Sequence, residues 1–201
     1  MGIKKGEWFL ILFNLAYILA FTVYYLGLKN YEFMLYIGVL VLVFLILFFM
    51  QRRLKFSYTI LWMISIWGLL HMMGGGVHLS NGTVLYRWIP LVLYDGTSID
   101  SDFIILKFDQ ILHAYIYFVV SIVMYHLLKF SARVNAKKVP LMLFVILASM
   151  GVSVINELIE FGAVVFLGNT GVGGYYNTLL DLVFNSLGAV IGGVVALRLK
   201  R

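Results

Sequence analysis

Long apolar stretches separated by short polar connections dominate this chain. A helix needs about 20 consecutive apolar residues to cross the hydrocarbon core of a bilayer. The pattern therefore predicts an all-α fold, a polytopic membrane helix bundle of about six transmembrane helices within a single transmembrane domain, residues 1–201. The predicted spans are residues 8–28, 31–50, 58–73, 108–128, 140–167 and 176–197.

The first stretch has a competing interpretation as a signal peptide. Lys4 and Lys5 precede it like a basic leader, and Ala16 and Ala20 offer small residues for cleavage. The apolar run continues to Leu28, which is too long for the hydrophobic core of a typical cleaved signal. We therefore interpret it as an uncleaved span.

One long connection, residues 74–107, is predicted to be an external loop. Asn81-Gly82 is a strong turn signal and predicts a small hairpin within residues 77–86. Residues 87–94 are apolar and aromatic enough to lie in the membrane interface. Three acidic residues are expected in its solvated part: Asp95, Asp100 and Asp102.

Composition agrees with a membrane protein. The chain is 63% hydrophobic and 12% charged, about half the charged share of a soluble domain. The net charge of +6 comes from short basic runs beside apolar segments, which argues against a nucleic-acid partner. No cysteine is present, so disulfides, thiol catalysis and thiolate metal sites are excluded.

The basic residues also predict the orientation of the chain. With both termini in the cytoplasm, twelve of the fifteen Lys and Arg residues lie on the cytoplasmic side, and Lys29, Arg87 and Lys107 lie outside. This bias follows the positive-inside rule. We predict a multi-pass protein of the inner or plasma membrane. The twelve are Lys4, Lys5, Arg52, Arg53, Lys55, Lys129, Arg133, Lys137, Lys138, Arg198, Lys200 and Arg201.

Two glutamates interrupt the fifth span. At 100° per residue, its polar side chains fall within about one third of the helix circumference, and a polar stripe in a membrane helix must face protein or water. The stripe consists of Ser149, Ser153, Asn156, Glu157 and Glu160.

Polar residues of three other spans are predicted to meet this stripe in the outer half of the membrane. Asp109 and His113 lie one turn apart at the start of the fourth span. Asp181 and Asn185 are similarly spaced in the sixth span, on one face with Gly188 and Gly192, which would allow close helix contact. His71 lies near the outer end of the third span.

The predicted cluster has an excess of negative charge. Asp109, Glu157, Glu160 and Asp181 carry four negative charges if all are ionised, and only Lys107 and Arg87 lie near enough in sequence to approach them. Shared protons, a bound cation or a cationic substrate group must neutralise such a buried cluster. A purely structural hydrogen-bonded network between helices is the alternative.

These residues suggest both acid–base catalysis and metal binding. The catalytic candidates are Glu157, Glu160, His113 and Asp109, because carboxylates and imidazole transfer protons. The candidate ligands of a divalent cation are Asp109, His113, Glu157, Glu160 and Asp181. The supporting residues are His71, Asn156 and Asn185.

The order of these motifs resembles the YjdF-type family of small bacterial and archaeal membrane proteins, over roughly residues 60–195. The motifs are His71-x-x-Gly-Gly, Asp109-x-x-x-His113, Glu157-x-x-Glu160 and Tyr176-x-x-x-x-Asp181-x-x-x-Asn185-x-x-Gly188. The family is similar in its last three helices to the VanZ-like group, whose named member is linked to teicoplanin resistance. Phe161 replaces the family's usual Trp, and Asn177 and Leu179 replace its Asp and Gln. The resemblance implies an inner-membrane protein of undefined activity.

Three functions remain open. The first is a membrane-embedded, metal-dependent hydrolase or transferase acting on a lipid or lipid-linked envelope molecule. The second is a module that binds an amphiphile such as a glycopeptide or lipid, by analogy with the VanZ-like group. The third is a proton- or cation-coupled transporter, because intramembrane carboxylates also relay protons. Expected partners are membrane lipids and an amphiphilic small molecule, and a homo-oligomer is compatible with the sequence.

Overall fold

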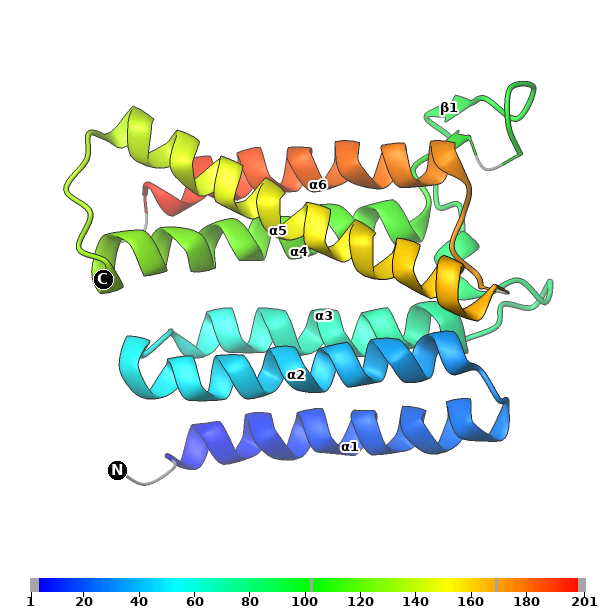
Figure 1. The fold of residues 1–201 in the computed structure, drawn as a ribbon, viewed down its shortest axis with the longest axis horizontal. Helices are drawn as coiled ribbons and strands as arrows, with labels where there is room; N and C mark the ends of the chain where they lie inside the picture. The colour runs from blue at the N-terminus through cyan, green and yellow to red at the C-terminus, as the bar shows by residue number, and fades with distance from the viewer. Residues whose placement is uncertain (1–3, 102, 169, 199–201) are drawn as a thin grey trace. The chain divides into compact units, whose positions relative to one another are not determined.

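A computed structural model describes residues 4–101, 103–168 and 170–198, so Asp102, Lys200 and Arg201 lie outside the described residues. Its six α-helices are each long and apolar enough to cross a membrane, which confirms the predicted all-α membrane fold (Figure 1). A π-helical turn, η2 (Leu127–Ser131), extends the fourth helix. The helices are α1 (Lys5–Gly27), α2 (Tyr31–Leu54), α3 (Tyr58–Gly76), α4 (Phe108–His126), α5 (Lys138–Leu167) and α6 (Tyr175–Ala196).

The chain divides into two compact units. The N-terminal unit, Met1–Leu85, contains α1 to α3, and the C-terminal unit, Tyr86–Arg201, contains α4 to α6. That both units form a single transmembrane domain stays a prediction.

In the N-terminal unit, α3 is longer than the sequence predicts. The predicted span ends at residue 73, before the glycine run, whereas the helix continues to Gly76. The glycines allow aromatic rings to approach the helix backbone, since a Cβ at Gly75 would overlap the ring of Phe33. The Tyr25 hydroxyl donates to the Met72 carbonyl oxygen at 2.6 Å.

The connection after α3 contains the predicted hairpin and a second pairing that the sequence did not indicate. His78 and Val84 form an isolated antiparallel bridge around Gly82, whose φ is +82°. In the C-terminal unit, β1 (Tyr94–Asp95) pairs antiparallel with β2 (Ile104–Ile105). Strands of two residues are too short to produce a period-two pattern.

In the C-terminal unit, α4 packs most extensively against α6, and α5 contacts both. The polar stripe of α5 faces the protein, as predicted, because Ser149, Ser153 and Glu157 are buried. The Ser149 hydroxyl donates to the Tyr117 carbonyl oxygen at 3.2 Å. This stripe positions the α5 carboxylates next to α4 and α6.

Two glycines bring the backbones of α4 and α6 together. A Cβ at Gly188 would overlap the carbonyl oxygen of Ala114, and a Cβ at Gly192 would overlap that of Phe118. Both glycines are buried on the face of α6 that also carries Asp181. The predicted close contact of this face is confirmed, as expected where small residues line a membrane helix interface.

Replacing Gly188 by Ala is expected to lower the free energy of unfolding by about 1–3 kcal/mol, the usual cost of overpacking. The new methyl group overlaps the Ala114 backbone, which moves only if α4 moves. Gly162→Ala on α5 is the matched control, because nothing lies within 4 Å of its Cβ position. Ala is about 1 kcal/mol better than Gly in a helix, so the control should unfold at the same or a slightly higher denaturant concentration. Equal midpoints for both variants would contradict the close contact.

Candidate functional site

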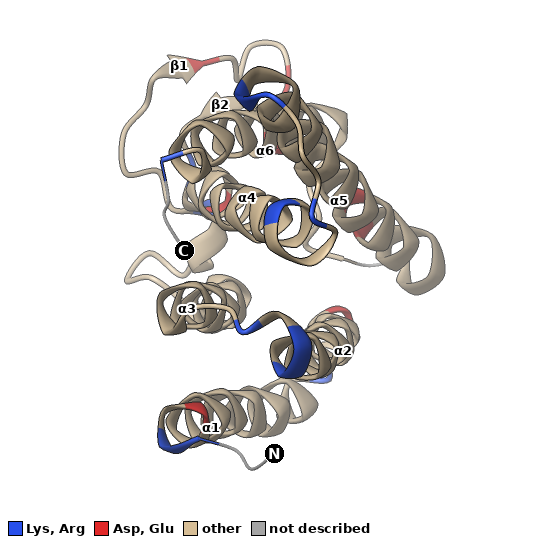
Figure 2. Ribbon diagram, turned by 90° about the vertical axis from the view of Figure 1, so that its left-hand side faces the viewer, with Lys and Arg blue, Asp and Glu red and all other residues tan. Residues whose placement is uncertain are grey.

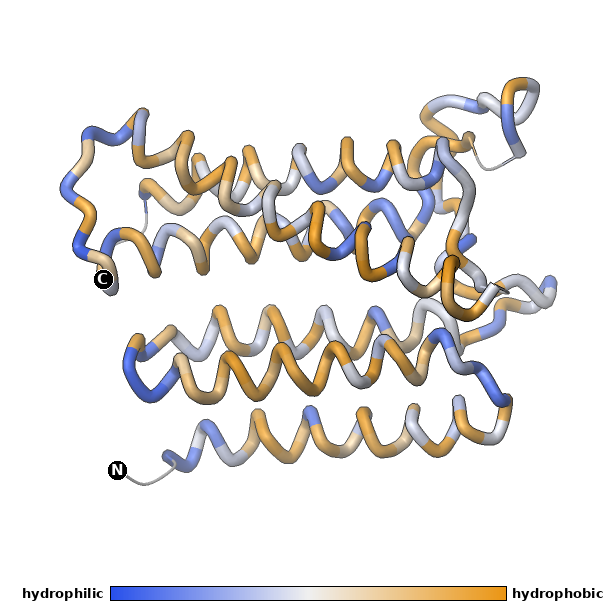
Figure 3. The backbone as a smooth tube through the Cα atoms, in the orientation of Figure 1, coloured by the Kyte–Doolittle hydropathy of each residue, from blue (hydrophilic) through white to orange (hydrophobic). Residues whose placement is uncertain are grey.

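Hydrophilic positions of α4, α5 and α6 gather toward the end of the C-terminal unit where α4 and α6 begin (Figure 3). At a rise of 1.5 Å per residue, the carboxylates and the histidine lie about 2–15 Å along the helices from that end. We call these residues the acid–histidine cluster. It comprises Asp109 and His113 of α4, Glu157 and Glu160 of α5, and Asp181 and Asn185 of α6.

Asn185 fixes the orientation of His113. The Asn185 amide nitrogen donates to Glu157 Oε1 at 3.1 Å, so its oxygen faces His113 Nδ1 at 2.9 Å and accepts a hydrogen bond from it. Asn185 is fully buried, and the reversed amide would place its oxygen against the acceptor Glu157 Oε1. This network assigns the proton of the neutral imidazole to Nδ1.

The other ring nitrogen of His113 faces a carboxylate. His113 Nε2 lies 3.6 Å from Asp109 Oδ1. With the proton on Nδ1, Nε2 of the neutral ring presents a lone pair, and a lone pair facing a carboxylate is repulsive. The geometry therefore requires either a proton or a cation between the two groups.

The two carboxylate oxygens of Asp181 differ in their hydrogen bonding. Its Oδ2 accepts from the Asn177 amide at 2.7 Å, and the Asn177 oxygen accepts from Lys107 Nζ at 2.7 Å. Asp181 is only 1% exposed. Within the part of the chain that the structure describes, its Oδ1 has no hydrogen-bond partner, and a buried oxygen in that state needs a hydrogen-bond donor or a cation.

The sequence indicated Lys107 as a residue near the cluster but assigned no role to Asn177. Asn177 precedes Asp181 by one helical turn, and this i, i+4 spacing is the signal that pairs them. Lys107 is buried, although lysine is almost never fully buried unless it is paired. Together they fix the rotamer of Asp181.

Gln110 holds the chain segment that leads to Lys107 and was not among the predicted site residues. Its Oε1 accepts from the backbone N–H groups of Leu106 and Lys107, and its Nε2 donates to the Ile104 carbonyl oxygen at 3.0 Å. Leu106 has a φ of 83°, which is strained for a branched residue. The available signal was a Gln at the third position of a helix, where it caps the preceding residues.

The two carboxylates of α5 differ in their surroundings. Glu157 Oε1 accepts from Asn185, whereas its Oε2 is buried and has no hydrogen-bond partner among the described residues. Glu160 Oε1 accepts from the Asn156 amide at 2.8 Å, on the same helix. The predicted supporting residues Asn156 and Asn185 thus contact the two glutamates.

Among the residues that the structure describes, two groups of three side chains have ligand atoms close enough to hold one metal ion. They are Asp109–His113–Asp181 and His113–Glu157–Glu160, and in each group the atoms lie within 4.8 Å of one another. His113 belongs to both. Imidazole with carboxylate oxygens suits a divalent transition metal such as Zn²⁺ or Mn²⁺.

Comparison with known proteins identifies a family but no activity. The family described as "Predicted membrane protein (DUF2238)" matches residues 9–201. The chain belongs to this family. No curated protein and no solved structure matches it. The match is consistent with the YjdF-type resemblance, and the link to the VanZ-like group stays a prediction.

The predicted supporting residue His71 lies on α3, in the N-terminal unit. Its ring stacks on Trp67 at a centroid distance of 5.2 Å and lies 5.7 Å from the ring of Tyr36. These contacts provide an aromatic environment for His71 on α3. Its contribution to the acid–histidine cluster stays a prediction.

Proposed function

We propose that this protein is a membrane-embedded enzyme that uses a divalent cation to hydrolyse or transfer a group of a lipid or lipid-linked envelope molecule. The observation that carries the proposal is a pair of ligand atoms. His113 Nε2 faces the carboxylate of Asp109, and Asp181 Oδ1 is buried without a hydrogen-bond partner among the described residues. A cation bound between them satisfies both atoms.

Asp109, His113 and Asp181 are the proposed cation ligands. Asn185 donates no hydrogen to the ring but accepts one from Nδ1, which directs the Nε2 lone pair away from Asn185 and toward Asp109. Metal-ligating histidines almost always donate their other ring N–H in this way. Three protein ligands leave a coordination position open, as in catalytic rather than structural sites. When bound, the cation supplies an activated water and an electrophile.

Glu157 and Glu160 are the proposed acid–base groups. Glu157 Oε1 lies 3.7 Å from His113 Nδ1, and its Oε2 has no hydrogen-bond partner in the described part of the chain. In hydrolysis, one glutamate accepts a proton from the attacking water. The new bond forms between the water oxygen and the ester or phosphate centre, and the leaving oxygen receives a proton as its bond breaks.

The depth of the cluster supports a lipid substrate. The cluster begins within the first turn of α4 and extends about 15 Å along the helices, which covers the boundary between headgroups and acyl chains in a bilayer. The segment before α4 exposes apolar side chains, among them Trp88 at 45%, Leu91 at 57% and Leu93 at 60%. Such a segment suits the membrane interface.

Packing beyond the cluster favours chemistry at one end over passage through the unit. Gly188 and Gly192 let α4 and α6 touch. The Ser121 hydroxyl donates to the Ala189 carbonyl oxygen at 2.9 Å, so it offers no free polar group to a path through the unit.

The distribution of basic residues supports cytoplasmic termini, which would place the cluster on the outer side of a cell membrane.

Metal analysis of the purified protein tests the proposal. We expect about one equivalent of Zn or Mn in the wild type. Asp181→Asn removes a ligand charge but keeps the shape, so the affinity should fall by more than the roughly 10–100-fold that loss of a ligand's outer hydrogen-bond partner costs. Asp95→Asn is the control. Asp95 is an exposed acid of the same unit, and hydrogen bonds from Thr97 hold its pKa below the ordinary value, so this change also removes a full charge at neutral pH.

Metal loss in Asp181→Asn but not in Asp95→Asn supports the proposal. A folded wild-type protein that binds neither metal contradicts it, and amphiphile binding or proton-coupled transport would then be the better account of the carboxylates.

A further inference from the structure

The N-terminal unit contains a second feature, which is separate from the acid–histidine cluster. A cavity of about 430 Å³ lies between α1, α2 and α3 and is lined mostly by apolar side chains, with Asn14 and Ser65 as polar residues of its wall. This volume is within the range of about 300–1,000 Å³ that is usual for ligand sites. At one end, a polar pocket of about 130 Å³ shares Glu7, Gln51 and Arg52 with it.

We propose that this cavity binds one acyl chain of an anionic phospholipid, with the phosphate of the lipid in the polar pocket. The inference does not depend on the proposed enzymatic function, because none of its residues belongs to the cluster. Its grounds are the length of the cavity and the charge at its mouth.

The cavity has the length of one lipid chain. On α1 its lining extends from Glu7 to Ile18, and on α2 from Val41 to Arg52. Eleven residues of helix span about 16 Å, which is close to half of the hydrocarbon thickness of about 30 Å. A single acyl chain of one leaflet therefore fits alongside both helices while its headgroup remains at the mouth.

The mouth is basic. Lys4, Arg52 and Lys55 line the polar pocket, and Glu7 is its acidic residue. The Glu7 carboxylate already accepts from the Lys4 backbone N–H at 2.8 Å and from the Gln51 amide at 3.5 Å. Three cationic side chains against one engaged carboxylate leave a net positive charge, which complements a phosphate.

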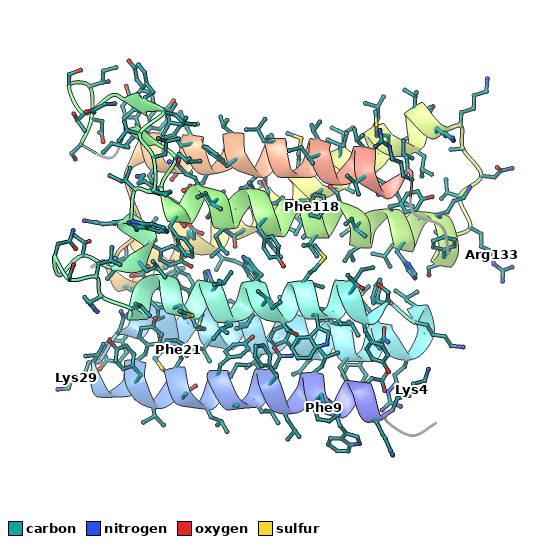
Figure 4. The ribbon with its side chains drawn as sticks, turned by 180° about the vertical axis from the view of Figure 1, so that it is seen from behind. Lys4, Phe9, Phe21, Lys29, Phe118 and Arg133 are labelled. Carbon is teal, nitrogen blue, oxygen red and sulfur yellow. The ribbon has the colours of Figure 1, made fainter. Side chains whose placement is uncertain are left out.

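The basic residues of the N-terminal unit gather at the end where the polar pocket lies. Basic residues occur at the start of α1 and at the α2–α3 turn, on the same end of the N-terminal unit (Figure 2). Lys4 marks that end of α1, and Lys29 marks the other (Figure 4). Arg52 lies 4.9 Å from the centroid of the Phe48 ring, so its guanidinium sits at the junction between the polar pocket and the apolar cavity.

The side-chain oxygen of Gln51, between the polar pocket and the apolar cavity, needs a hydrogen-bond donor. Gln51 Oε1 is buried and has no hydrogen-bond partner among the described residues, although the Gln51 nitrogen donates to Glu7 and to the Phe56 carbonyl oxygen. A lipid headgroup or glycerol hydroxyl can supply that donor. Phosphatidylglycerol provides both the negative charge and hydroxyl groups.

The test uses the full chain in nanodiscs, with native mass spectrometry to count retained lipids. We expect one phosphatidylglycerol per chain to be retained in preference to phosphatidylcholine. Arg52→Gln and Lys55→Gln should each weaken this preference about fivefold, since a basic residue near a membrane surface contributes about 1 kcal/mol to the binding of anionic lipid. Arg53→Gln is the matched control, because Arg53 neighbours Arg52 on the same helix and lines neither cavity.

A second pair of variants tests occupation of the cavity. Val41 lines the cavity and is 37% exposed, so Val41→Trp adds a large ring to the cavity wall and should abolish the retained lipid. Leu42→Trp, at an exposed position outside the lining, should not. Equal losses of lipid preference in Arg52→Gln and Arg53→Gln would mean that the basic residues attract anionic lipid only in a general way, which would overturn the proposal. Full lipid retention in Val41→Trp would also overturn it.

Discussion

Zn²⁺ or Mn²⁺ added to cation-stripped wild-type protein is expected to raise its free energy of unfolding by about 4 kcal/mol at a free concentration of 1,000 times Kd. The same addition to His113→Ala should change it by less than about 0.5 kcal/mol. His113 is the one side chain shared by both candidate metal groups. Its loss therefore removes a ligand whichever group holds the cation. The measurement is thermal or denaturant unfolding in detergent, with and without metal, and it needs no knowledge of the substrate.

The comparison must use the increment on metal addition rather than absolute stability. His113→Ala also leaves the Asn185 oxygen without its donor, and an unsatisfied buried acceptor costs about 1–3 kcal/mol on its own. His126→Ala is the matched control, since His126 is the last residue of the same helix and its ring packs on Phe130. A similar metal response in His113→Ala and wild type would contradict the proposed site.

The sequence predicted the helices well because the membrane imposes a simple rule. Every backbone group must be satisfied within the bilayer, so an apolar run of sufficient length becomes a helix. The ends of the helices were harder to predict. α2 continues through Arg52 and Arg53 to Leu54, because basic residues in the last turn interact favourably with the helix dipole. Charge marks the end of a membrane span and does not mark the end of a helix.

The carboxylates, the histidine and the supporting asparagines Asn156 and Asn185 could be found in the sequence, but two other residues that hold the site in place could not. An acid inside an apolar helix is conspicuous in any sequence because insertion is costly. Gln110 and Asn177 are ordinary polar residues near helix starts, and only the fold shows that both are buried. The contact that joins separate segments is the one from Lys107 Nζ to the Asn177 oxygen. It depends on how the start of α4 packs against α6, which no local pattern specifies.

Glu157→Gln and Glu160→Gln should separate catalysis from cation binding. If Asp109, His113 and Asp181 hold the cation, both variants should retain about one equivalent of metal. Their turnover should fall by about 10²–10⁴-fold, the contribution expected of a general acid or base. The assay incubates extracted envelope lipids with wild type and variants and follows by mass spectrometry the lipid that wild type consumes.

Ser153→Ala is the control on the same helix. Ser153 is buried one turn before Glu157 and carries no charge, so this variant should retain both metal and turnover. The distinction rests on geometry, because the Asn185 amide directs Glu157 Oε1 toward His113 Nδ1 and not toward Nε2, which faces Asp109. Loss of metal in Glu157→Gln and Glu160→Gln, with normal binding in Asp181→Asn, would instead assign the cation to the α5 glutamates. Asp109 and Asp181 would then be the remaining acid–base groups.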